Sequence, residues 1–100
     1  MRVVLAPSAL SELGDTWKWN AAQWGVRRAN GYFAFLRKAI LSLSKAPLSG
    51  RRMEDRPETW YVVAKRRPKG HGHIIVYTIA GDLVTVLHVF HTAQDWESKL

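Results

Sequence analysis

Two long apolar runs lie near the end of the chain, at residues 73–80 and 83–90, and only Gly81 and Asp82 separate them. Each run is rich in Ile, Val and aromatic residues, which are typical of β-strands. A two-residue loop that begins with Gly suits a tight hairpin, because Gly adopts positive φ without a Cβ clash. The pattern therefore predicts an antiparallel β-hairpin over residues 73–90.

The short loop also fixes which side chains share a face of this hairpin, because a one-residue slip would swap every face. If Ala80 lies opposite Leu83, one face is almost purely aliphatic and the other carries imidazole and phenol groups. We expect the aliphatic face to form the core and the other face to be open. The residues expected to face the helices are Ile74, Val76, Leu87 and Val89, and those expected to face away are His73, Tyr77 and His88.

Apolar residues at intervals of three and four predict two helices in the first half of the chain. The first helix ends at Gly25, and the second runs over residues 26–45 and stops before Pro47. Because almost no loop separates them, the two helices should form an antiparallel hairpin. The first stripe is Leu10, Leu13, Trp17, Ala21 and Trp24, and the second is Ala29, Phe33, Leu36, Ile40 and Leu43.

The remaining segments predict short strands at residues 2–6 and 60–65, a loop at residues 48–58, and a short terminal helix with Thr92 as its N-cap. The 100 residues form one domain. The expected fold is α+β with two layers: an N-terminal strand and an antiparallel helical hairpin packed on a four-stranded antiparallel sheet, followed by a short C-terminal tail.

The chain carries fifteen Lys and Arg against eight Asp and Glu, a net charge of +7. Such a bias favours anionic partners: nucleic acid, an acidic protein or an anionic membrane surface. The alternative is a basic surface that has no specific anionic partner. There is no cysteine, residues 1–7 are too short for a signal peptide, and no apolar run approaches a membrane span, so we expect a cytoplasmic protein.

One group of polar residues could carry chemistry. On the open face of the predicted sheet, Lys65 and Arg67 would join His73, Tyr77 and His88, a set able to bind RNA phosphate and to act in general acid–base catalysis. The alternative is that these are solvated surface positions. The four histidines have no acidic partners or helical spacing typical of a metal site, so we expect neither a metal nor a cofactor.

Trp19 lies off the apolar stripe of the first helix. A large exposed ring on a helix is a common anchor for a protein partner. The alternative is that this ring packs under the N-terminal strand or the tail.

Several segments, taken in order, form a recognisable set that covers nearly the whole chain. They are the opening Val3-Val4-Leu5 with Ala6-Pro7-Ser8-Ala9, the helical positions Leu10, Leu13, Leu36, Ile40 and Leu43, the segment Ala46-Pro47-Leu48-Ser49-Gly50, the strands His73–Tyr77 and Val86–His91, and the ending Gln94-Asp95-Trp96. Together they resemble the RelE/ParE superfamily of type II toxin–antitoxin toxins.

The ending resembles the ParE branch, whose members poison DNA gyrase and are not enzymes. The RelE branch cuts mRNA on the ribosome and ends in a tyrosine or a His-Tyr pair, whereas here Thr92 follows His91 and no tyrosine lies beyond Tyr77. The ParE resemblance implies that His91, Asp95 and Trp96 bind the target. It also implies an acidic antitoxin, for which Trp19, Arg27 and Arg28 are candidate contacts. With these two protein partners, we expect no membrane contact, and contact with nucleic acid only indirectly, through the antitoxin or gyrase. The alternatives are an mRNA endonuclease of the RelE type, with Lys65, Arg67, His73, Tyr77 and His88 as its candidate residues, and a basic interaction module or decayed toxin that only binds antitoxin.

Overall fold

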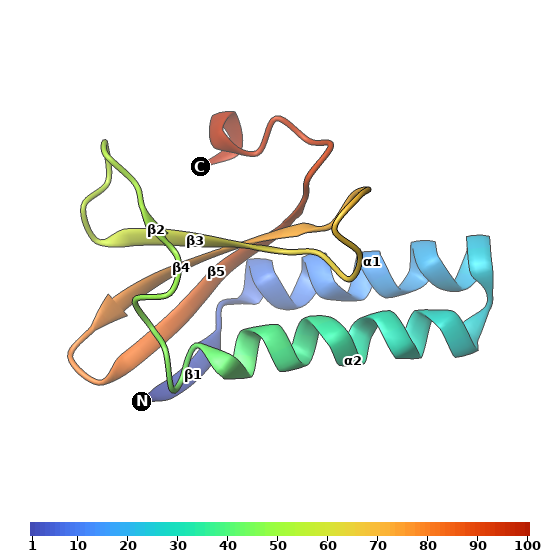
Figure 1. The fold of residues 1–100 in the computed structure, drawn as a ribbon, viewed down its shortest axis with the longest axis horizontal. Coiled ribbons are helices and arrows are strands. Elements are labelled where there is room, and N and C mark those ends of the chain that lie inside the picture. Colours follow the sequence, from blue (N-terminus) through green and yellow to red (C-terminus); the bar gives the residue numbers. More distant parts are fainter.

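The computed structural model describes residues 1–100, in which two long helices follow a short first strand and precede the rest of a sheet (Figure 1). Pro7 occupies the first turn of the first helix, where a missing N–H costs nothing. Gly25, with φ of 92°, separates the two helices. The elements are β1 Arg2–Leu5, α1 Pro7–Trp24, α2 Val26–Ser42, β2 Arg51–Arg52, β3 Thr59–Ala64, β4 His73–Ala80, β5 Leu83–His91 and the 3₁₀ helix η1 Glu97–Lys99.

The sheet has five strands in the order β1-β5-β4-β3-β2. Both helices cover one of its faces, and the C-terminal tail lies over the other face (Figure 1). The α+β architecture predicted from the sequence is confirmed, with two differences in the sheet. The two-residue strand β2 adds a fifth strand, and β1 runs parallel to β5, so the sheet is mixed rather than wholly antiparallel.

The hairpin of β4 and β5 has the predicted turn but not the predicted faces. Ala80 pairs with Leu83 and Thr78 with Thr85, as expected, and the register then shifts between Val76 and Tyr77. Tyr77 pairs with Val86 and Val76 with His88, so Leu87 is an extra residue in β5, a β-bulge. Beyond the bulge the pairing is shifted by one residue from the predicted register, so Val89 lies opposite Ile75 rather than Ile74.

The prediction that Ile74 and Val76 face the helices is therefore wrong, as is the prediction that His73 and Tyr77 face away. Tyr77 packs in the core under the helices, and His73 contacts side chains of both helices. Val89 does lie in the helix-side core, as expected. The prediction assumed that only the helices bury an aliphatic face of the sheet. The C-terminal tail buries the face that carries Ile74 and Val76.

The larger core lies between the helices and the sheet, and a smaller apolar cluster lies between the sheet and the tail. The helix-side core contains Ala9, Leu13, Leu36, Ile40, Leu43, Ala64, Ile75, Tyr77, Val84, Val86 and Val89. The tail cluster contains Ile74, Val76 and Phe90, with Tyr61, Trp96 and Leu100 packed against them. The tail thus buries apolar surface that would otherwise face water.

The predicted stripes hold along most of α2 and only partly along α1. Ala29, Leu36, Ile40 and Leu43 are buried, whereas Trp24 is 57% exposed. The helical hairpin extends beyond the sheet in Figure 1, which leaves its tip without a covering layer.

The terminal helix expected from Thr92 is also shorter than predicted. Only Glu97–Lys99 forms a single 3₁₀ turn, and the Thr92 hydroxyl accepts a hydrogen bond from the Gly72 N–H at 3.0 Å instead of capping a helix. No helix has the length and apolar character needed to cross a bilayer.

Candidate functional site

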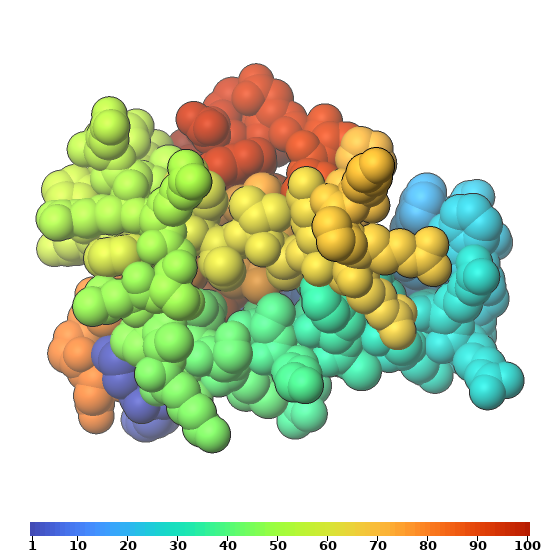
Figure 2. Space-filling model, in the orientation of Figure 1, coloured from blue at the N-terminus to red at the C-terminus, as the bar shows by residue number.

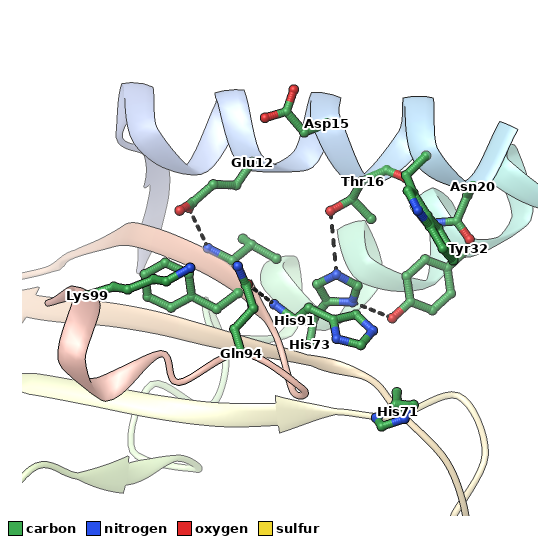
Figure 3. Close-up of a pocket in the computed structure, with 13 residues that line it drawn as sticks. Glu12, Asp15, Thr16, Asn20, Tyr32, His71, His73, His91, Gln94 and Lys99 are labelled. Atoms are coloured by element: carbon green, nitrogen blue, oxygen red, sulfur yellow. Dashed lines mark hydrogen bonds between the residues drawn. The ribbon is translucent and has the colours of Figure 1, made fainter. Parts of the chain in front are cut away.

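A groove with a volume of about 730 Å³ lies between α1, the adjacent ends of β4 and β5, and the tail (Figure 3). Its side chains come from segments far apart in the sequence, so neither helix pattern nor strand pattern alone could predict it. Carboxylates from α1 lie at one end, and imidazoles from the strands lie at the other (Figure 3). The groove is lined by Glu12, Asp15, Thr16, Trp19, Asn20, Tyr32, His71, His73, Val89, Phe90, His91, Gln94 and Lys99.

His73 is the buried imidazole of this groove, with only 4% of its surface exposed. Its Nδ1 lies 2.6 Å from the Tyr32 hydroxyl, and its Nε2 lies 3.4 Å from the Thr16 hydroxyl (Figure 3). Burial, with a smaller contribution from the nearby His91, lowers the pKa of His73 to about 4. At neutral pH this side chain is therefore an uncharged hydrogen-bonding link between both helices and β4.

The imidazole of His91 stands between two other histidine rings. Its ring centroid lies 5.3 Å from that of His73, at a right angle, and 5.3 Å from that of His71. Partial burial lowers the pKa of His91, and His71 adds to that effect. The spacing of these rings does not form a metal site, and no group of three or more His, Cys, Asp or Glu side chains has suitable geometry.

Glu12 fixes the free edge of β5, where β1 has ended and α1 passes alongside. Its carboxylate accepts a hydrogen bond from the Val89 N–H at 2.9 Å and lies 3.1 Å from Nδ1 of His88. His88 also stacks on Phe90, with ring centroids 4.6 Å apart. Sequence reasoning missed Glu12, because its main partner is a backbone N–H whose availability depends on where β1 stops pairing.

Tyr77 is fully buried, so it cannot belong to a surface site. Its hydroxyl donates to the Pro47 carbonyl at 2.7 Å and accepts from the Gly50 N–H at 3.2 Å. Burial raises the pKa of this phenol. The tyrosine thereby ties the loop after α2 to the sheet.

The candidate nuclease residues are consequently not brought together on one surface. Lys65 and Arg67 are exposed in the turn between β3 and β4, whereas His73 and Tyr77 lie on the helix side of the sheet. His88 is held at the edge of β5 by Glu12.

The candidate target-binding residues lie in and just before the tail. Trp96 packs on Tyr61, with ring centroids 5.0 Å apart, and Asp95 beside it is exposed. The His91 N–H donates to Oε1 of Gln94 at 2.8 Å, and Nδ1 of His91 accepts from the Ala93 N–H at 3.1 Å. These contacts hold the turn that sends the chain back across the sheet.

The candidate antitoxin-binding residues fall in two places. Trp19 is 59% exposed and lines the groove, so it does not pack under the N-terminal strand or the tail. Arg27 and Arg28 are exposed near the tip of the helical hairpin, where the Arg28 guanidinium lies 5.6 Å from the ring centroid of Trp24. Trp19 therefore shares a groove with His91, a candidate target contact.

One protein family matches almost the whole chain, and solved structures share its fold. A family model described as the ParE toxin of the type II toxin–antitoxin system parDE matches residues 3–96. Among solved structures, the chain is similar to one from the chromosomal ParDE TA system of P. aeruginosa, with a TM-score of 0.75, 14% identity, and coverage of 90% of this chain and 94% of that one. A YoeB/ParE toxin from Agrobacterium tumefaciens gives a TM-score of 0.57, 14% identity, and coverage of 90% and 96%. A comparison with curated protein sequences gave no match.

Proposed function

Because the chain belongs to the ParE toxin family of type II toxin–antitoxin systems, and is thus a toxin component, we propose that it acts by binding and inhibiting DNA gyrase, and that an acidic antitoxin neutralises it. In this proposal the protein is not an enzyme. Its effect comes from occupying a surface of the target.

The single observation that carries the choice of an inhibitor over a ribonuclease is the position of Tyr77 and His73. Cutting RNA through its 2′-hydroxyl needs a base, an acid and cations within hydrogen-bond reach of one phosphate. Tyr77 is wholly buried and His73 is 4% exposed, on the opposite side of the sheet from the tail. Both hydrogen-bond within the fold, so neither is free for a phosphate.

The tail is the proposed target-binding segment. It presents Asp95 to solvent, while Trp96 fixes the segment on Tyr61 and the tail cluster. A segment that is already ordered loses less conformational entropy on binding than a free tail would. In this proposal gyrase contacts the segment that runs from His91, at the groove, to Asp95 and Trp96 in the tail.

The proposed antitoxin contact is Trp19, supported by Arg27 and Arg28. Trp is among the residue types most enriched at binding hot spots, and exposed guanidinium groups would attract an acidic segment. Because Trp19 and His91 line the same groove, an antitoxin seated there would cover part of the target surface. Neutralisation would then follow from mutually exclusive binding.

Induction of this protein in a bacterial host tests the proposal. We expect plasmids in the induced cells to lose negative supercoiling while total mRNA stays full-length, and co-expression of the cognate antitoxin to prevent both growth arrest and the change in plasmid topology. Early cleavage of translated mRNA with normal plasmid topology would contradict it.

A further inference from the structure

Basic and acidic residues are strongly segregated along this chain. Residues 16–53 and 59–81 contain no Asp or Glu, yet these two stretches hold twelve of the fifteen Lys and Arg. The first stretch includes all of α2, and the second includes the turn between β3 and β4. The acidic residues lie on α1, in the loop before β3, at the tip of the β4–β5 hairpin and in the tail.

The fold brings the two basic stretches together. A Cβ at Gly31 of α2 would lie only 3.5 Å from the guanidinium of Arg66, so that side chain crosses the helix at this point. The turn lies against α2 in Figure 2, where residues 65–70 are gold and α2 is cyan to green. Lys and Arg side chains from α2 and from the turn between β3 and β4 therefore share one surface.

Two of the four cations of α2, Arg27 and Lys38, lie on one face of the helix, and Arg28 and Arg37 lie to either side of that face. Arg27 and Lys38 are eleven residues apart, which is close to three full turns and about 16 Å. Gly31, beneath Arg66, lies between them on nearly the same face. We call this surface the basic face, and it comprises Arg27, Lys38, Arg66, Arg67 and Lys69.

No carboxylate compensates these charges. All five side chains of the basic face belong to exposed residues, and no Lys or Arg of the structure forms a salt bridge with an Asp or Glu. The one freely exposed ring close to these cations is Trp24 at the hairpin tip, where the Arg28 guanidinium lies 5.6 Å from its centroid. Along the rest of the basic face, the nearby rings of Phe35 and Tyr32 are half-buried, so no aromatic rings alternate with the cations. Single-stranded nucleic acids are usually bound by aromatic rings interleaved with cations, whereas a duplex presents phosphates alone to such a surface.

We propose that the basic face binds the phosphate backbone of duplex DNA, so that this toxin contacts the DNA held by its target as well as the target protein. The choice of DNA rests on the proposed gyrase inhibition. The contact is independent of base sequence, because cations spaced along a helix reach phosphates rather than base edges. Its affinity is expected to fall steeply with salt, since each neutralised phosphate releases a counterion.

The test measures binding of the purified protein to a labelled duplex of about 30 base pairs by fluorescence anisotropy, at about 50 and 200 mM salt, a range over which phosphate contacts weaken strongly. The variant R67Q/K69Q removes two cations of the basic face in an exposed turn. The control variant R2Q/R51Q removes two exposed cations from the outermost strands, β1 and β2. Circular dichroism confirms that both variants are folded.

Over this salt range, the wild-type affinity should fall about tenfold further than that of R67Q/K69Q, as expected for two lost phosphate contacts. The control should keep the wild-type salt dependence. Equal losses in both variants, tighter binding of single-stranded DNA or RNA, or equal binding of poly-glutamate would each overturn the proposal.

Failure of the proposed DNA contact can be distinguished from failure of the proposed gyrase inhibition. If the protein inhibits supercoiling but R67Q/K69Q binds DNA like the wild type, only the DNA contact is wrong. If DNA binding behaves as expected but gyrase is unaffected, the basic face stands and the proposed target falls.

Discussion

The Tyr32 hydroxyl lies 2.6 Å from Nδ1 of His73, and this contact joins the middle of α2 to the first residue of β4. Thr16 of α1 approaches the other ring nitrogen of His73 at 3.4 Å. One neutral imidazole thus links the two helices to the sheet beside the groove. The same buried ring is poorly suited to carry a positive charge.

The stability of the protein should therefore fall in acid because of His73. Its folded pKa of about 4 lies below the ordinary value of 6.5, so the unfolded chain takes up a proton that the folded chain resists. The contribution of neutral His73 to the free energy of unfolding is complete above pH 6.5 and is lost as the pH falls from 6.5 toward 4. His73 should account for roughly 3 kcal/mol of this loss near the folded pKa, because each tenfold difference in proton affinity corresponds to about 1.4 kcal/mol.

Urea denaturation at about pH 7 and about pH 4.5, on either side of the ordinary His pKa, measures this loss. H73Q provides the comparison because its amide does not titrate. H73Q should be less stable at neutral pH, yet show a smaller difference between the two pH values. His71, His91 and Arg66 lie in the same region and can also affect how stability depends on pH. The variant H91Q measures the contribution of His91, which stands between the other two rings. An unchanged pH dependence in H73Q would show that other groups cause the acid loss.

Tyr77→Phe should destabilise the fold without altering the protein surface. The change leaves the Pro47 carbonyl and the Gly50 N–H without their partner in a partly buried position. Such a loss costs about 1–3 kcal/mol. Tyr61→Phe is the matched control, because its ring would still pack on Trp96 and no loop is tied down by the Tyr61 hydroxyl. Equal urea midpoints for the two variants would contradict the structural role of the Tyr77 hydroxyl.

Trp19→Ala should weaken antitoxin binding without loss of stability. Its exposed ring has little packing to lose, whereas truncation of a Trp hot spot typically costs about 2 kcal/mol or more, roughly a 30-fold loss of affinity. Leu10→Ala is the control, since that side chain is similarly exposed on the same helix but does not line the groove. Titration calorimetry with the antitoxin would contradict the assignment if Leu10→Ala lost as much affinity as Trp19→Ala.

Trp96→Ala should reduce gyrase inhibition while antitoxin binding is retained. The change removes the ring that packs on Tyr61 and the tail cluster, so the tail loses its fixed position. Because this ring is only partly buried, the loss of stability should be roughly 1–2 kcal/mol, less than for a fully buried Trp. Glu97→Gln, an exposed neighbour, should change neither property. Full inhibition by Trp96→Ala would exclude the docked tail as the target contact.

The helical hairpin and the tight turn of β4 and β5 could be predicted because their patterns are local. The period of apolar residues in α2 and the Gly81-Asp82 turn depend on neighbours in sequence. The faces of β4 could not be predicted, because the aliphatic residues Ile74 and Val76 are buried by the tail rather than by the helices. The bulge at Leu87 has no local sequence signal either.

The groove was predictable only in fragments. Trp19 stood out because it lies off the apolar stripe of its helix, and His91 stood out through the resemblance of the chain ending. Their shared groove arises from how α1 crosses the edge of β5, which is a tertiary property. His73 was expected on an open surface, since a histidine in a strand carries no sequence signal for a Tyr partner 41 residues away.

The most direct test of gyrase inhibition is the supercoiling of relaxed plasmid by purified gyrase and ATP, measured against increasing amounts of this protein. We predict that supercoiling is lost as the protein is added and is restored by the cognate antitoxin. Full supercoiling in the presence of a large excess of the folded, antitoxin-free protein would contradict this prediction.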